Sequence, residues 1–139
     1  SSCKGVLRGL HYQLPPEPQG KLVRCSVGTI FDVAVDLRAH SSTYGLWVSA
    51  ELSASNQQQL WVPVGFAHGF LTLSARAEVQ EKASGFWNRQ CERNLSWADP
   101  SLNVAWPLDG IGLNTPLLAE KDATAPGLAE LAAAGEVFA

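Results

Sequence analysis

Short apolar runs separated by prolines and glycines constrain the fold of this chain more than any other feature. Up to about residue 112 these turn-forming residues recur every few positions, and the runs between them are rich in Val, Leu, Trp and Phe. β-Branched and aromatic residues fit a pleated sheet, so this pattern is typical of an all-β sandwich or jelly roll. Only residues 128–134 have a helical composition, which predicts a short C-terminal helix.

Residues 30–38 give the clearest strand pattern. Phe31, Val33 and Val35 alternate with polar or small residues that include Asp32 and Asp36. This alternation predicts one face in the core, with the two aspartates either lining a barrel or meeting solvent. Further strands are expected at residues 5–13, 21–27, 44–52, 58–62, 70–73, 77–83 and 93–97.

Glycine and proline positions predict two local features. Residues 21–27 are expected to pair with residues 30–38 through a turn at Gly28 and Thr29, because glycine tolerates the positive φ of a tight hairpin. Pro63 and Gly65 are expected to bend the chain, which would set His68 at a strand end.

Length and composition indicate one ordinary globular domain over residues 1–139. Hydrophobic residues make up 46% of the chain, charged residues 17%, and the net charge is −3. This balance excludes the basic footprint of a nucleic-acid binder. Three widely spaced cysteines form no C-x-x-C pair, and no apolar run reaches membrane-span length. We therefore expect reduced thiols, no membrane association and a cytoplasmic location.

The first strand carries a histidine beside a glycine. In a regular strand Arg8 would face one side while Gly9 and His11 face the other. A residue without Cβ near His11 lets a backbone or a ligand approach the imidazole. A histidine that is simply hydrogen-bonded within the structure is the alternative.

Several short motifs follow one another along the chain. They are RGLHYQ at 8–13, QGKLVR at 19–24, residues 30–38, PVGFAHGF at 63–70, WADP at 97–100, WPL at 106–108 and EKD at 120–122. Taken together, and in matching order over nearly the whole chain, they resemble the dTDP-4-dehydrorhamnose 3,5-epimerase family. The resemblance implies a cupin-like double-stranded β-helix, or jelly roll, with a ligand pocket inside the barrel, and a homodimer that epimerises a nucleotide-linked 4-keto-6-deoxy sugar.

Epimerisation next to a ketone needs a base, a group that stabilises the enolate, and an acid on the opposite face. A histidine with an ordinary pKa of about 6.5 suits the base, and a carboxylate fixes its tautomer. By resemblance the base is His11, its carboxylate partner is Glu120, and Lys21 stabilises the enolate. The alternatives are a solvated Glu120 and an exposed strand lysine.

The resemblance also implies four substrate-binding residues. Arg8 would contact the nucleotide diphosphate, since a guanidinium matches phosphate oxygens. His68 would orient the sugar, and Trp87 would lie against the nucleotide, with Lys121 also at the substrate. A satisfied core histidine is the alternative for His68. Five other aromatic residues lie in strand-like runs and are expected in the core: Phe31, Trp47, Trp61, Phe66 and Phe70.

No metal or other cofactor is expected. The usual cupin metal pattern places two histidines one residue apart with a nearby glutamate. Here His11, His40 and His68 are far apart in sequence, and no ligand spacing supports a metal.

Two departures from the family pattern affect the functional prediction. The family's acid is a tyrosine, and Glu81 occupies that position. A glutamate with an ordinary pKa of about 4.3 is a poor proton donor at neutral pH, so we expect proton return to be impaired. The family segment that precedes the first motif and reaches the dimer partner is also absent. The alternatives to an epimerase are a related sugar-nucleotide ketoisomerase and a non-catalytic sugar-binding or assembly protein.

Overall fold

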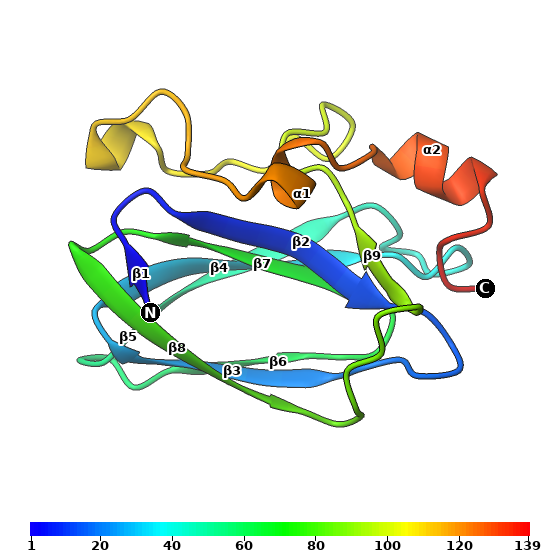
Figure 1. Ribbon diagram of the computed structural model, residues 1–139, viewed down its shortest axis with the longest axis horizontal. Helices are drawn as coiled ribbons and strands as arrows, with labels where there is room; N and C mark the ends of the chain where they lie inside the picture. The colour runs from blue at the N-terminus through cyan, green and yellow to red at the C-terminus, as the bar shows by residue number, and fades with distance from the viewer.

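The computed structural model describes residues 1–139 as two facing β-sheets, with a C-terminal layer over one of them (Figure 1). The jelly-roll prediction is confirmed. The strands are β1 (Ser2–Cys3), β2 (Leu7–Gln13), β3 (Lys21–Val27), β4 (Thr29–Asp36), β5 (Trp47–Ser53), β6 (Gln59–Val62), β7 (Phe66–Thr72), β8 (Arg76–Ala83) and β9 (Glu92–Asn94). The helices are a 3-10 turn (Asp109–Ile111), α1 (Glu120–Ala123) and α2 (Leu128–Ala133).

Strand pairing is antiparallel and nested. One sheet has the order β1-β8-β3-β6 and the other β5-β4-β7-β2-β9. The pairs β4–β5, β3–β6, β2–β7 and β1–β8 therefore enclose one another along the chain. This places β2 and β3, which are consecutive in sequence, in opposite sheets.

The predicted hairpin at Gly28 is wrong. β3 pairs with β6 and β8, and β4 pairs with β5 and β7, so the chain crosses between the sheets at this point. Gly28 has a φ of 76°, and an added Cβ would lie 2.0 Å from the carbonyl oxygen of Arg76. The glycine was correctly associated with a sharp turn, but it forms a corner between layers.

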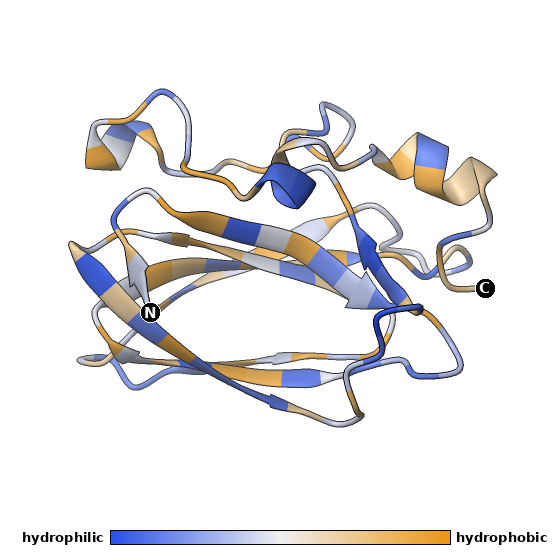
Figure 2. Cartoon of the chain, viewed as in Figure 1, coloured by the Kyte–Doolittle hydropathy of each residue, from blue (hydrophilic) through white to orange (hydrophobic).

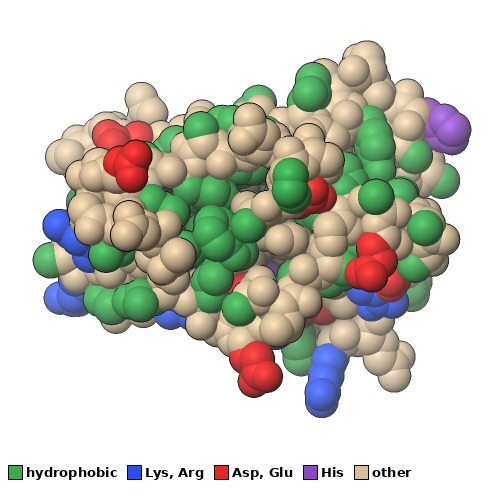
Figure 3. Space-filling model, turned by 90° about the horizontal axis from the view of Figure 1, so that it is seen from above, with side chains coloured by type: hydrophobic (Ala, Val, Ile, Leu, Met, Phe, Trp, Pro, Cys, Tyr) green, Lys and Arg blue, Asp and Glu red, His purple; other side chains and the backbone are tan.

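Both faces of the five-stranded sheet are buried. Ile30 and Ala34 of β4 belong to a cluster between the sheets, whereas Val33 and Val35 pack under the C-terminal layer. Figure 2 shows hydrophobic residues along both sheets and α2, and Figure 3 shows hydrophobic side chains gathered on the face formed by this layer. The alternate residues of β4 therefore face two different buried clusters, one between the sheets and one under the C-terminal layer.

Asp32 and Asp36 are consequently not exposed to solvent. Their relative exposures are 0% and 1%. Asp36 accepts hydrogen bonds from Arg38, Ser41 and Thr43. Burial favours a raised pKa for this carboxyl, but these donors outweigh burial and hold the pKa below its usual range.

The expectation of five core aromatics is wrong for Trp61. Its exposure is 55%, because it lies on the outer side of β6. Phe70 is buried, and the remaining three, Phe31, Trp47 and Phe66, are partly buried against the two clusters.

The expected bend before His68 does not end the strand. β7 begins at Phe66, so His68 is its third residue and pairs with both β2 and β4. The side chain therefore lies within the sheet and is 3% exposed.

A bulge at Gly9 changes which side of β2 the residues on either side of it face, so the expectation for a regular strand is wrong here. Arg8 pairs with Phe70 and His11 pairs with His68, so one extra β2 residue is inserted between the two pairs. Arg8 and His11 consequently both line cavities between the sheets, although a regular strand would separate them.

We expect Gly9→Ala to lower the free energy of unfolding by at least about 2 kcal/mol. Gly9 has a φ of 131°, and a Cβ there would lie 2.6 Å from the Cα of Gly69. Denaturant unfolding measures the loss. The matched control is Gly110→Ala, whose Cβ would meet nothing within 4 Å; equal stability of both variants would contradict the prediction.

Candidate functional site

A cavity of about 290 Å³ lies between the sheets at the end where β2 finishes and β3 begins. It brings together four of the residues expected from the sequence, His11, Lys21, Glu81 and Trp87. We call it the His11 cavity. Its complete lining is His11, Tyr12, Gln13, Gln19, Lys21, Glu81, Ala83, Trp87 and Glu92.

His11 is held by a buried carboxylate. Its Nε2 lies 2.6 Å from Oδ1 of Asp122, whose side chain is only 3% exposed, and the second oxygen accepts the backbone N–H of Gly9. Burial alone would raise the pKa of Asp122, but the His11 hydrogen bond and charge lower it. The carboxylate therefore fixes Nε2–H as the donor and leaves Nδ1 with a lone pair.

The expected partner, Glu120, does not contact His11. Glu120 begins the single turn of α1 and is exposed, whereas Asp122 is buried. Residues two apart on a helical turn point to nearly opposite sides, because each residue advances the helix by about 100°. Asp122 therefore faces β2 while Glu120 faces solvent.

Arg8 lines a second cavity, of about 280 Å³, which also contains Glu81 and Phe70. Its Nε donates to Ser2 Oγ at 3.0 Å and its Nη2 donates to the carbonyl oxygen of Ser1 at 3.4 Å. Glu81 lines both cavities, so they adjoin at this residue. We call the two cavities together the groove; Arg8 lies in one part, and His11 and Lys21 lie in the other.

His68 lies beneath this groove and lines neither cavity. Its Nε2 is 2.6 Å from Asp32 Oδ1, and its Nδ1 is 3.4 Å from Glu81 Oε1. Burial is the largest influence on Asp32 and raises the pKa of its carboxyl, partly offset by His68. The structure thus pairs His11 with Asp122 and His68 with Asp32.

Trp87 and Lys121 meet at the rim of the His11 cavity through Glu92. Glu92 accepts a hydrogen bond from the indole Nε1 and another from Lys121 Nζ at 3.1 Å. Gln13 fixes the same loop, since its amide donates to Phe86 O and accepts from Asn88 N. The exposed indole is thereby fixed at one edge of the groove.

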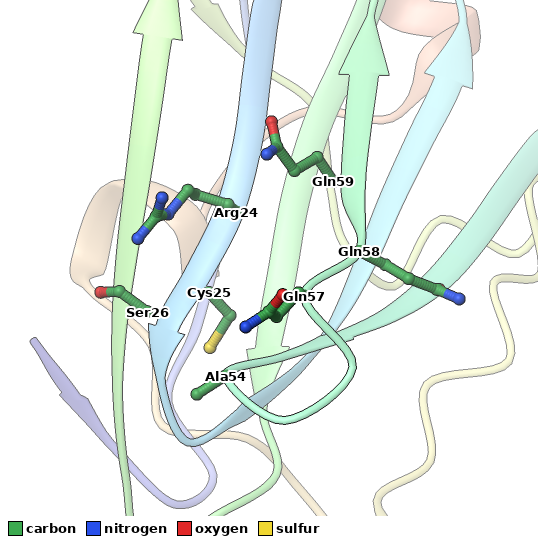
Figure 4. Close-up of a pocket in the computed structure, with 7 residues that line it drawn as sticks. All are labelled: Arg24, Cys25, Ser26, Ala54, Gln57, Gln58 and Gln59. Atoms are coloured by element: carbon green, nitrogen blue, oxygen red, sulfur yellow. The ribbon is translucent and has the colours of Figure 1, made fainter.

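Another cavity, of about 400 Å³, opens at the far end of β3 (Figure 4). Its lining contains no histidine or carboxylate, so it lacks the acid–base groups of the first site. Its residues are Arg24, Cys25, Ser26, Ala54, Gln57, Gln58 and Gln59. Across the whole chain, no group of three or more His, Cys, Asp or Glu side chains is placed to hold a metal ion, and no helix is long and apolar enough to cross a membrane.

Comparison with known proteins decides the family. The sequence model of the family described as dTDP-4-dehydrorhamnose 3,5-epimerase matches residues 1–130. The chain belongs to this family. It is 55% identical over 121 residues to the dTDP-4-dehydrorhamnose 3,5-epimerase of Shigella flexneri, a match that covers 87% of this chain and 64% of that protein. The chain thus spans less than two thirds of that relative's length.

Solved structures of the family superpose closely on the chain. The Legionella pneumophila dTDP-6-deoxy-D-glucose-3,5-epimerase in complex with dTDP-4-keto-L-rhamnose has a TM-score of 0.90 and 44% identity, covering 99% of this chain and 70% of that one. ChmJ of Streptomyces bikiniensis, a 3'-monoepimerase in complex with dTDP-quinovose, has a TM-score of 0.90 and 33% identity, with coverages of 99% and 67%.

Three site residues were missed from the sequence. Asp122 belongs to the EKD motif, but only the orientation of α1 shows that Asp122, and not Glu120, faces His11. Asp32 was visible as a charge within an apolar strand, a signal that is now explained by His68. Glu92 gave no signal, because its role depends on the fold of the loop that carries Trp87.

Asp122→Asn should lower the free energy of unfolding at pH 7 by about 1–3 kcal/mol, because a buried charge-assisted hydrogen bond is lost. Glu120→Gln is the matched control and should change stability little. The pKa of Asp122 is lowered by folding, so its contribution is present above about pH 4 and is lost as the pH falls. Denaturant unfolding at pH 7 and pH 3 measures this, and a larger loss in Glu120→Gln would restore the sequence-based assignment.

Proposed function

We propose that the protein epimerises a nucleotide-linked 4-keto-6-deoxy sugar of the dTDP-4-dehydrorhamnose type by removing a proton alpha to the ketone. The observation that carries this proposal is the pairing of His11 with the buried Asp122 at a cavity shared with Lys21. A base and a cation in one cavity are what enolate chemistry requires. The family membership and the dTDP-sugars bound to relatives support the substrate class.

His11 acts as the base through Nδ1. Because Asp122 accepts the Nε2 proton, the neutral ring keeps its lone pair on Nδ1, and the same carboxylate stabilises the imidazolium after proton transfer. Lys21 extends from the first residue of β3 on the opposite sheet. Its ammonium offsets the charge that develops on the carbonyl oxygen as the enolate forms.

Arg8 and Trp87 hold the nucleotide. The Arg8 guanidinium lines the neighbouring cavity and suits the oxygens of a diphosphate. Trp87 is 65% exposed and Phe86 is 86% exposed, so this loop presents two aromatic faces on which a base can stack. Lys121 lies beside Trp87 through Glu92 and adds positive charge at the rim.

His11→Asn should reduce solvent-deuterium incorporation into a 4-keto sugar nucleotide by at least about a hundredfold, because the base is removed. Nucleotide affinity should change little, since the base acts mainly in the transition state. Mass spectrometry of the recovered sugar nucleotide measures the exchange.

His40→Asn is the matched control, because His40 is exposed and lies outside the cavity. It should exchange at the rate of the unsubstituted protein. If the unsubstituted protein bound the nucleotide but incorporated no deuterium, a non-catalytic sugar-binding role would replace the proposed activity.

We further propose that residues 1–139 act as one domain, that this domain forms a homodimer, and that it works in the cytoplasm. The edge strand β5 carries Val48, which is 57% exposed, and Leu46 beside it is 60% exposed. An apolar sheet edge is favourably covered by a second chain. The three cysteines form no disulfide, as is usual in a reducing compartment.

Sedimentation velocity at micromolar concentration should give the mass of two chains. Val48→Lys should shift the distribution toward the single chain, because a buried lysine at an apolar contact is unfavourable. A single-chain mass for the unsubstituted protein would contradict the dimer, and an unchanged dimer in Val48→Lys would exclude this edge from the contact.

A further inference from the structure

The sequence predicted that Glu81 impairs proton return; from its contact with His68 we propose instead that Glu81 is the acid that returns the proton and that His68 and Asp32 supply it through a relay. This inference rests on the proposed function, which it deepens by assigning the second half of the reaction. Glu81, His68 and Asp32 will be called the acid relay.

The acid relay crosses from one sheet to the other. Asp32 of β4 and His68 of β7 lie on the five-stranded sheet, and Glu81 of β8 lies on the four-stranded sheet. The imidazole has one carboxylate on each ring nitrogen, at 2.6 Å on Nε2 and at 3.4 Å on Nδ1. Such a ring can release a proton on one side while remaining held by the other carboxylate.

Only Glu81 gives this arrangement access to a substrate. The His68 side chain is 3% exposed and the Asp32 side chain 0%, whereas the Glu81 side chain is 36% exposed and lines both cavities of the groove. A proton that leaves His68 toward the groove therefore passes to the Glu81 carboxylate. An isolated surface glutamate would have no such internal source.

The position of Glu81 suits the stereochemistry of inversion. His11 projects into the groove from the five-stranded sheet, and Glu81 projects from the sheet opposite. A sugar ring held between the sheets meets the base on one face and the acid on the other. Inversion requires this geometry, because the proton must return from the side opposite to its removal.

The return step moves one proton from Glu81 to the carbon atom of the enolate. The O–H bond of protonated Glu81 breaks, the enolate electron pair forms the new C–H bond, and the ketone is restored. The Glu81 carboxylate then takes a proton from Nδ1 of the His68 imidazolium. Between turnovers His68 regains a proton from solvent by way of Glu81, the exposed member of the acid relay. The proton taken by His11 leaves separately, so no oxidant, reductant or metal enters the step.

Charged and titratable groups face the acid relay from neighbouring strands. Asp32 Oδ2 has no hydrogen-bond partner, so His68 is the side chain that holds this buried carboxyl group. Lys21 of β3 acts on Asp32 through its charge, and His11 of β2 is paired in register with His68. The carboxyl groups of Asp32 and Glu81 attract positive charge at the imidazole ring, whereas the charge of Lys21 opposes it.

Glu81→Gln should lower the ratio of net inversion to deuterium exchange by at least about a hundredfold, because a glutamine of the same size cannot donate a carboxyl proton. Both quantities are measured on one sample, exchange by mass spectrometry and inversion by proton NMR of the sugar. Glu78→Gln is the matched control on the same strand, where Glu78 pairs with the exposed Arg76, and its ratio should equal that of the unsubstituted protein. An unchanged ratio in Glu81→Gln would overturn the proposal.

Glu81→Tyr tests the relay separately from the acid. Tyrosine can donate a proton from the same strand position but has no carboxylate to receive one from His68. Inversion in Glu81→Tyr should therefore tolerate a further His68→Gln change, which in the unsubstituted background lowers the inversion-to-exchange ratio at least about tenfold. Equal sensitivity to His68→Gln in both backgrounds would contradict a relay through Glu81.

A readout independent of activity separates this inference from the proposed function. The ¹⁵N NMR signal of His68 Nδ1 should move on Glu81→Gln and stay in place on Glu78→Gln, whatever substrate the protein uses. A protein that shows this shift but no exchange would contradict the epimerase proposal and leave the contact between His68 and Glu81 supported. Exchange without the shift would contradict the relay and leave the epimerase proposal supported.

Discussion

The close approach of β2 and β7 at Gly9 and Gly69 is the constraint on which the site depends. An added Cβ on either glycine would lie under 3.0 Å from the opposite backbone, so no side chain fits between the strands here. The approach allows the bulge that places Arg8 and His11 on the same side of the strand. Without it, Arg8 and His11 would face different layers of the protein.

The C-terminal layer has a chemical role as well as a packing role. α2 supplies Leu128 and Leu131 to the cluster that covers the five-stranded sheet. α1 lies on the same side of the sheet (Figure 1), and its Asp122 is hydrogen-bonded to His11. The hydrophobic contacts of one helix thereby hold the layer in which the other helix positions the carboxylate that pairs with His11. Loosening this layer would remove the partner of His11 even if the barrel itself remained folded.

Local sequence patterns predicted the strands better than their partners. Residues 21–27 form β3 as expected, because alternation and turn residues are local properties. The predicted hairpin at Gly28 failed because a glycine permits a turn without specifying which sheet the chain enters. The family resemblance identified His11 and Lys21, which the structure brings into one cavity, but chose Glu120 where the structure places Asp122. That choice depends on the rotation of one helical turn, which neither composition nor spacing reveals.

The nested strand order also determines how much chain lies between His11 and His68 when their strands pair. The β4–β5 pair encloses one short connection, whereas the β2–β7 pair encloses all the strands from β3 to β6. The entropy lost on closing a loop rises with its length, and non-local pairing slows folding. The rung that joins His11 to His68 is therefore a long-range contact whose formation becomes much less costly once the inner pairs have shortened the effective loop. In this topology, the pairing of His11 with His68 forms most readily after the strands between them have paired.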